Sequence, residues 1–190
     1  MNILTDQLPT AVEIDGREYK LNTDFRVCLR IILAFEDPGL TQEEKQWVLL
    51  ANLYPVLPDN LTTAFELGMK FMDGGHDGEE KEEMSLRLYS FSQDSNFIFA
   101  AFRQTHGIDL ETTDLHWWKF LALFMDLGVD TTFCSLTGLR KRLATGEATD
   151  AEKKMAEEMS SVIELKEVYE RPTELYELED TFMQQLTGGK

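Results

Sequence analysis

The sequence predicts a mainly α-helical protein with a small N-terminal β-hairpin and an acidic, helical C-terminal extension. Three observations lead to this fold class. Apolar residues recur at three- and four-residue steps along most of the chain, an Asp-Gly pair separates two alternating segments near the N-terminus, and acidic residues concentrate toward the C-terminus. We place a helical domain with the hairpin at 1–146 and the extension at 147–190.

The hairpin is predicted from Asp15-Gly16. This pair lies between two segments, 10–14 and 17–21, in which apolar and polar residues alternate. Alternation is typical of a half-buried strand, and Asp-Gly suits a two-residue turn in which both central residues have positive φ. An isolated hairpin is only marginally stable, so we expect this one to pack on helices.

Three helices are predicted in the rest of the N-terminal half, because each apolar periodic segment follows residues whose side chains can cap a helix. They run from Asn22-Thr23-Asp24 to the turn at Asp37, from Thr41 to Tyr54, and from Asp59 or Asn60 to Gly74. Thr41 and Glu44 have the spacing of a capping box. The polar residues 76–84, with four glutamates, are predicted to form a mobile loop.

Three further helices are predicted before the extension. One follows Asp94 or Ser95 and ends at Gly107, one is capped by Thr112, Thr113 or Asp114 and ends near Gly128, and one spans about 132–143. In the middle helix, one stripe contains Leu115, Trp118, Leu121, Ala122 and Met125. This stripe predicts that Trp118 lies in the core, and it leaves Trp117 open as either a core or an interface residue.

The extension contains two narrow apolar stripes on a strongly acidic background. A helix after Thr149 or Asp150 would align Met155, Met159, Val162, Ile163 and Tyr169, and after Arg171-Pro172 the residues Leu175, Leu178, Phe182 and Leu186 repeat at helical steps. The stripes either dock on the same domain or contact another chain. The candidate partner-binding residues are therefore Trp117, Met155, Met159, Val162, Ile163, Leu175, Leu178 and Phe182.

The charge of the chain limits its partners. The 190 residues contain 35 acidic and 18 basic side chains, a net charge of −17. The excess lies mainly in residues 59–84 and 147–190, whereas 85–146 is neutral. Phosphate binding needs clustered Lys and Arg, so we expect no nucleic-acid partner and no attraction to an anionic membrane. Neither a signal peptide nor an 18-residue apolar segment is evident, which predicts a cytoplasmic protein.

Residues that would carry chemistry are few. The three histidines lack the spacing of metal ligands, and no motif combines a nucleophile with a base. His116 is interpreted as a hydrogen-bonded structural residue. Cys28 and Cys134 are interpreted as two buried thiols, with a disulfide left open. We therefore expect no enzyme activity, no cofactor and no metal.

A longer pattern resembles a known family. It consists of Leu4-Thr5 and Val12 to Gly16, then Asn22 to Arg26, then Tyr89-Ser90-Phe91-Ser92-Gln93-Asp94-Ser95-Asn96-Phe97-Ile98-Phe99-Ala100-Ala101-Phe102, Gly107-Ile108-Asp109-Leu110, and Leu115-His116-Trp117-Trp118-Lys119-Phe120 with Ala122-Leu123. Over residues 1 to about 145 the chain resembles a family of tailed-phage and prophage proteins of Gram-positive bacteria, named for the fifteenth gene product of its type phage.

The resemblance implies a role in tail morphogenesis, because members are encoded near the major tail protein and the tape-measure protein. It implies a non-enzymatic tail assembly chaperone that binds the tape-measure or tail-tube protein in the host cytoplasm. Two alternatives stay open: a structural component of the virion tail, and an acidic inhibitor that mimics DNA. Homo-oligomerisation is also left open.

Overall fold

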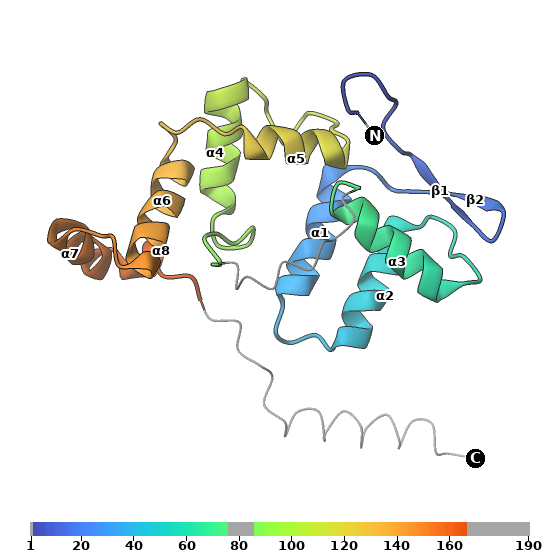
Figure 1. Ribbon diagram of the computed structural model, residues 1–190, viewed down its shortest axis with the longest axis horizontal. Helices are drawn as coiled ribbons and strands as arrows, with labels where there is room; N and C mark the ends of the chain where they lie inside the picture. Colours follow the sequence, from blue (N-terminus) through green and yellow to red (C-terminus); the bar gives the residue numbers. More distant parts are fainter. Residues whose placement is uncertain (1, 76–85, 167–190) are drawn as a thin grey trace, which may run out of the picture.

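The computed structural model describes residues 2–75 and 86–166 (Figure 1). The first range contains β1 (Ala11–Ile14), β2 (Arg17–Lys20), α1 (Phe25–Glu36), α2 (Gln42–Leu53) and α3 (Leu61–Met72). The second contains α4 (Ser95–His106), α5 (Trp117–Met125), α6 (Thr132–Thr145), α7 (Asp150–Glu158) and α8 (Ser160–Ile163). The predicted fold class is therefore confirmed: the described part is mostly helical with one small hairpin. The predicted loop at 76–84 lies outside the described residues.

The hairpin forms where the Asp-Gly pair predicts it. β1 and β2 are antiparallel, with Val12 opposite Tyr19 and Ile14 opposite Arg17. Asp15 and Gly16 have φ angles of 50° and 76°, the two positive values that the tight turn requires. Ile14 is buried in the main core, so the hairpin is held by packing on the helices.

Side-chain caps set where α1, α2 and α3 begin. Asp24 accepts a hydrogen bond from the backbone N–H of Arg26, and Thr41 forms the predicted capping box with Glu44. In Figure 1, α1, α2 and α3 lie beside one another in chain order, and α1 and α3 both pack on α2. The helices α2 and α3 approach closely at Gly68, where a Cβ would lie only 2.7 Å from Leu49 Cδ2.

The helices α1 and α5 meet at their N-terminal ends through the backbone. The N–H of Phe25 donates to the carbonyl of Leu115 (3.0 Å), and the N–H of Trp117 donates to the carbonyl of Thr23 (2.7 Å). Thus two strand-like hydrogen bonds hold together segments that are far apart in the sequence. The second half continues from this joint, with α4 packed against α5 and α6.

The main core is built around Phe120 of α5. Its ring stacks on Phe25 of α1 and Phe102 of α4, at centroid distances of 5.1 and 4.9 Å. Trp117 stacks on the same ring at 5.5 Å, and its indole N–H donates to the carbonyl of Met72 (2.8 Å). Because the indole N–H is satisfied, Trp117 can be almost fully buried, at 1% exposure. The core alternative for Trp117 is therefore confirmed.

The stripe predicted for this helix is wrong. α5 begins at Trp117, capped by His116, and it buries Trp117, Phe120 and Phe124. Trp118 is only half-buried and Met125 is 82% exposed. The physical reason is the pairing with Thr23, which keeps residues 113–116 out of the helix and fixes which face of α5 meets the core.

The extension packs on α6 as far as the structure describes it. The single helix predicted after Thr149 is instead two, α7 and α8, separated at Met159. Thr149 caps α7 in a capping box with Glu152. Ile163 of α8 is buried against Leu136 and Leu139 of α6, in a second and smaller apolar cluster. This part of the extension thus docks on its own chain.

A buried ion pair ties the extension to α4. Arg140 of α6 forms two hydrogen bonds with Asp94, at 2.7 and 2.9 Å, and both side chains are at most 5% exposed. The same guanidinium donates to the carbonyls of Leu88, Val162 and Ile163. We call this group the Asp94–Arg140 clamp. Asp94 precedes α4 as predicted, yet its carboxylate accepts from Ser90 N–H instead of capping the helix.

Candidate partner-binding site

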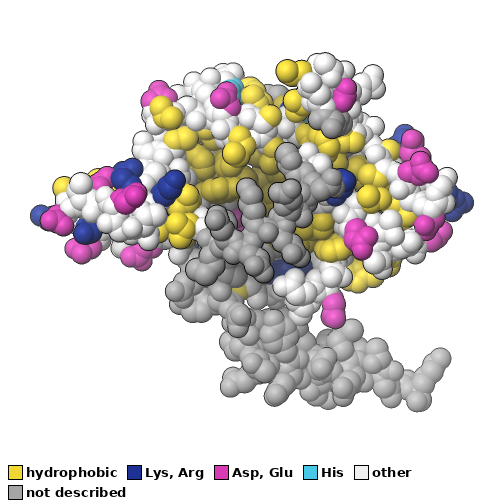
Figure 2. Space-filling model, viewed as in Figure 1, with side chains coloured by type: hydrophobic (Ala, Val, Ile, Leu, Met, Phe, Trp, Pro, Cys, Tyr) yellow, Lys and Arg dark blue, Asp and Glu magenta, His cyan; other side chains and the backbone are white. Residues whose placement is uncertain are grey.

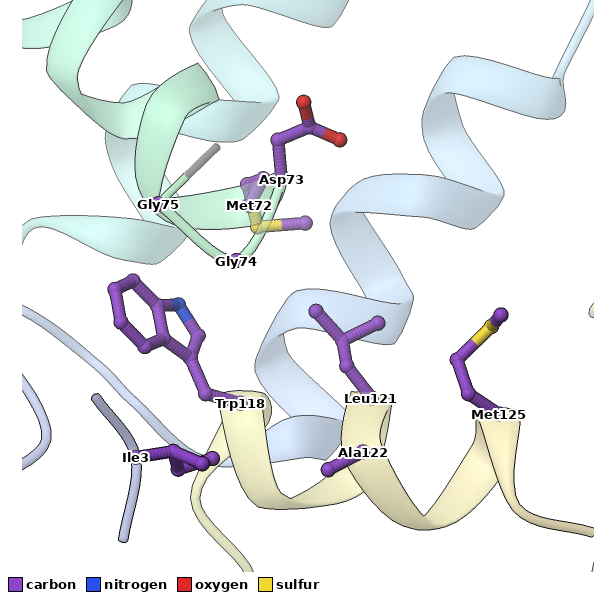
Figure 3. Close-up of a pocket in the computed structure, with 9 residues that line it drawn as sticks. All are labelled: Ile3, Met72, Asp73, Gly74, Gly75, Trp118, Leu121, Ala122 and Met125. Carbon is purple, nitrogen blue, oxygen red and sulfur yellow. The ribbon is translucent and has the colours of Figure 1, made fainter. Parts of the chain in front are cut away.

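The outer face of α5 lines an open hollow beside the end of α3 (Figure 3). The hollow has a volume of about 610 Å³, and we call it the α3–α5 pocket. Its lining residues are Ile3, Met72, Asp73, Gly74, Gly75, Trp118, Leu121, Ala122 and Met125. It exists because the core takes the opposite face of α5, which leaves an apolar stripe turned outward.

Trp118 forms a fixed wall of the pocket. Its indole N–H donates to the carbonyl of Phe71 (2.8 Å), and its ring stacks on the Phe71 ring at 5.8 Å. The chain leaves α3 through Gly74 and Gly75, both with positive φ. A Cβ at Gly75 would lie 2.6 Å from Trp118 Cη2, so the close approach of backbone and indole requires glycine.

The remaining walls can adjust their shape. In Figure 3, Trp118, Leu121 and Met125 project from the same side of α5 toward Met72. Met125 is 82% exposed, and Ile3 is about half exposed. Methionine is unbranched and flexible, so its side chain fits apolar partners of different shapes. The pocket therefore combines one rigid aromatic wall with adaptable apolar side chains.

His116 supports this site from the start of α5. Its Nδ1 accepts from the backbone N–H of Trp118 (3.1 Å), and its Nε2 lies 3.0 Å from the carbonyl of Pro9. A carbonyl only accepts, so Nε2 carries the proton and the ring is neutral. Burial lowers the pKa of His116, and Lys119 lowers it further, against the opposing effect of the Pro9 carbonyl. The predicted structural role of His116 is confirmed.

The candidate partner-binding residues from the sequence fall in different places. Trp117 is in the core, which removes it from the accessible surface, and Ile163 is buried as well. Met155 and Met159 are 42% and 46% exposed on the extension, and Val162 is half-buried. Leu175, Leu178 and Phe182 lie outside the described residues, as do Tyr169 and Leu186. For the exposed and undescribed residues, partner binding stays a prediction.

Groups suited to covalent or metal chemistry are scarce in the described ranges. Within 2–75 and 86–166, no three His, Cys, Asp or Glu side chains are grouped as metal ligands would be. Both cysteines are free, and burial together with the charge of Asp24 raises the pKa of Cys28 to about 12. This thiol thus stays protonated at neutral pH. Cys134 is half-buried and contacts the carbonyl of Leu127.

The fold and the pocket define the class: a mainly α-helical protein with an N-terminal hairpin and an outward-facing apolar hollow. The Bacteriophage Gp15 protein family matches the chain over residues 4–170. The chain belongs to this family and is a bacteriophage protein, consistent with a role in phage structure or morphogenesis. No curated protein and no solved structure matches the chain significantly. No helix within the described ranges is long and apolar enough to cross a membrane.

Proposed function

We propose that this protein is a non-enzymatic tail assembly chaperone that binds the tape-measure protein in the cytoplasm of the bacterial host. The observation that carries the proposal is the α3–α5 pocket, an apolar hollow open on the surface of a phage protein. A tape-measure helix exposes apolar side chains until the tail tube encloses it. A groove that binds such a helix temporarily keeps it soluble.

The pocket has the properties that a helix-in-groove complex needs. Trp118 supplies a rigid surface that loses little conformational entropy on binding, because its own hydrogen bond and stacking already hold it. Met72 and Met125 supply contacts that rearrange to suit successive segments of a long helix. A chaperone of this kind needs affinity for a type of surface more than for one sequence.

The net charge of −17 supports the same function in another way. Like charges on many copies of the chaperone repel one another, so a coated tape-measure protein stays dispersed. Among the described residues, Asp73 is the one charged side chain that lines the α3–α5 pocket, and the other described residues that line it are apolar or glycine.

Co-expression with the tape-measure protein encoded by the same phage tests the proposal. Met125→Glu places a charge at the pocket edge on a side chain that is 82% exposed, so folding should be unaffected. We expect binding to weaken at least about tenfold, which corresponds to about 1.4 kcal/mol. Val129→Glu is the matched control, because Val129 is 90% exposed and does not line the pocket.

Three results would distinguish the chaperone function from the two alternative functions. If the proteins do not co-purify and the tape-measure protein gains no solubility, the chaperone function is wrong. Detection of the protein in purified particles by mass spectrometry would indicate a structural tail component instead. Salt-sensitive binding to a basic host nuclease or repressor would indicate the DNA-mimicking inhibitor.

A further inference from the structure

A second apolar hollow lies between α1 and α4. Figure 2 shows that apolar side chains gather at the surface between two charged ends of the molecule. We call it the α1–α4 groove. Its volume is about 300 Å³, and its lining is mostly apolar: Leu29, Leu33, Phe91, Ile98, Phe99 and Leu110. Leu33 and Phe99 are 38% and 39% exposed, so the groove is open to an apolar ligand.

The described chain ends beside this groove. Lys166 and Leu33 line the same neighbouring hollow, and Leu33 also lines the α1–α4 groove, so the two hollows adjoin at this residue. Gln93 holds the chain end in place: its side chain donates to the carbonyl of Glu164 (2.6 Å) and accepts from Lys166 N–H (3.1 Å).

The Asp94–Arg140 clamp fixes the preceding turn. Arg140 donates to the carbonyls of Val162 and Ile163, four and three residues before Lys166. Whatever follows Lys166 therefore starts from a fixed point next to the groove. A chain segment tethered in this way reaches a nearby site at high effective concentration, in the millimolar range for short linkers.

The sequence after this point contains a suitable ligand. Leu175, Leu178 and Phe182 are spaced as one face of an amphipathic helix. Nine residue steps separate Leu175 from Lys166, which span up to about 30 Å when extended. Residues 167–190 contain six acidic and two basic side chains. Arg30, exposed on α1 one turn from Leu33, makes no ion pair within the described residues and can pair with one of these acids.

We propose that residues 172–186 of the chain dock in its own α1–α4 groove, with Leu175, Leu178 and Phe182 against the apolar lining. The segment acts as an intramolecular ligand that covers the groove. The proposal does not depend on the chaperone function, because that function is assigned to the α3–α5 pocket.

Photo-crosslinking in the full-length protein tests the docking. Phe99 is replaced by p-benzoylphenylalanine, which places the reactive group at the groove, and the same replacement at Val129 is the control. We expect irradiated Phe99→p-benzoylphenylalanine to give a crosslinked monomer whose linked peptide, identified by mass spectrometry, lies within 172–186. The Val129 control should give at least about fivefold less of this product, because Val129 lines neither hollow.

A second substitution tests the residues that dock. Leu178→Glu with Phe182→Glu should lower the crosslink yield at least about fivefold, whereas Asp180→Asn, at a position on the opposite side of the helical pattern from the apolar stripe, should leave it unchanged. Crosslinks confined to other segments would overturn the proposal. Crosslinked dimers would also overturn it and would identify a second copy of the chain as the occupant. Loss of tape-measure binding alone would leave the docking result unaffected.

Discussion

Two buried regions of the molecule are stabilised by different interactions. The aromatic core around Phe120 consists of stacked rings from α1, α4 and α5. The Asp94–Arg140 clamp, at the junction of α4, α6 and α8, consists of a charged pair surrounded by backbone carbonyls. The stability of the aromatic core depends on contact area and shape. The stability of the Asp94–Arg140 clamp depends on whether every buried hydrogen-bond donor and acceptor has a partner.

The clamp meets that condition completely. A guanidinium has five N–H donors, and Arg140 uses Nε on Ile163, Nη1 on Leu88 and Asp94, and Nη2 on Asp94 and Val162. A buried pair of this type adds little net stability compared with apolar residues, but it tolerates few alternative arrangements. The aromatic core therefore supplies stability, whereas the clamp sets where the extension lies.

Phe120→Ala should have the largest effect on stability. The ring is fully buried and contacts aromatic rings from three helices, so its loss leaves a cavity that the core cannot close. We expect the free energy of unfolding to fall by about 4–5 kcal/mol in urea titration. Phe99→Ala, at a side chain that is 39% exposed, should cost about 1 kcal/mol. Equal losses would mean that the rings around Phe120 do not form the main core.

Asp94→Asn should lower the free energy of unfolding by about 3 kcal/mol, because it leaves the charge of Arg140 buried without a counter-charge. The amide oxygen of Asn still accepts a hydrogen bond, which limits the loss. Asp94→Leu with Arg140→Met removes both charges and should recover part of that stability, because the buried charge is gone but the carbonyls of Leu88, Val162 and Ile163 lose their donor. In the double variant, hydrogen exchange should nevertheless increase at 160–166, since the bonds to Val162 and Ile163 are gone. If exchange there stayed slow, the clamp would not position the extension.

Gly68→Ala should lower the free energy of unfolding by about 1–2 kcal/mol, although alanine favours a helix over glycine by about 1 kcal/mol. The added Cβ would lie 2.7 Å from Leu49 Cδ2 and 3.1 Å from Leu53 Cδ2. Gly138→Ala in α6 is the control, because its Cβ would meet only the flexible end of Arg142, at 3.4 Å. The free energy of unfolding of Gly138→Ala, measured by thermal or urea unfolding, should rise by about 0.5–1 kcal/mol. A gain at both positions would show that α2 and α3 can separate without cost.

The smallest effect should come from His116 and depend on pH. Burial lowers its pKa below the ordinary value of 6.5, so between the two values the unfolded state binds more protons. This contribution to stability is fully present above pH 6.5 and is lost as the pH falls toward the lowered pKa. His116→Asn keeps a capping side chain but does not titrate. Comparison of unfolding at pH 7.5 and 5.5 should show a smaller loss in the variant than in the unchanged protein.

The parts of the fold that the sequence predicts correctly are those set by neighbouring residues. Asp15-Gly16 determines the hairpin turn, and Thr41 with Glu44 determines the start of α2. Both depend on interactions that span no more than a few positions, so the local pattern contains the necessary information.

The orientation of α5 shows where local information is insufficient. The sequence from Trp117 to Met125 is apolar at every position except Lys119, so its periodicity does not select a buried face. The buried face is fixed by two backbone hydrogen bonds, from Trp117 to Thr23 and from Phe25 to Leu115, which connect distant parts of the chain. The α3–α5 pocket was missed for the same reason, because Ile3 and Met72 reach it from other segments.

The joint between α1 and α5 also bears on how the protein is made. Arg26, in the first turn of α1, donates to the carbonyls of Leu110 and Thr113, 84 and 87 positions later. During synthesis, α1 cannot acquire these partners until more than half of the chain has left the ribosome. Closing so long a loop is slow, and the stacked face of Phe25 stays uncovered until it closes. During synthesis the joint can therefore form only after residues 110–117 have emerged, and until then the face of Phe25 that stacks on Phe120 has no partner ring.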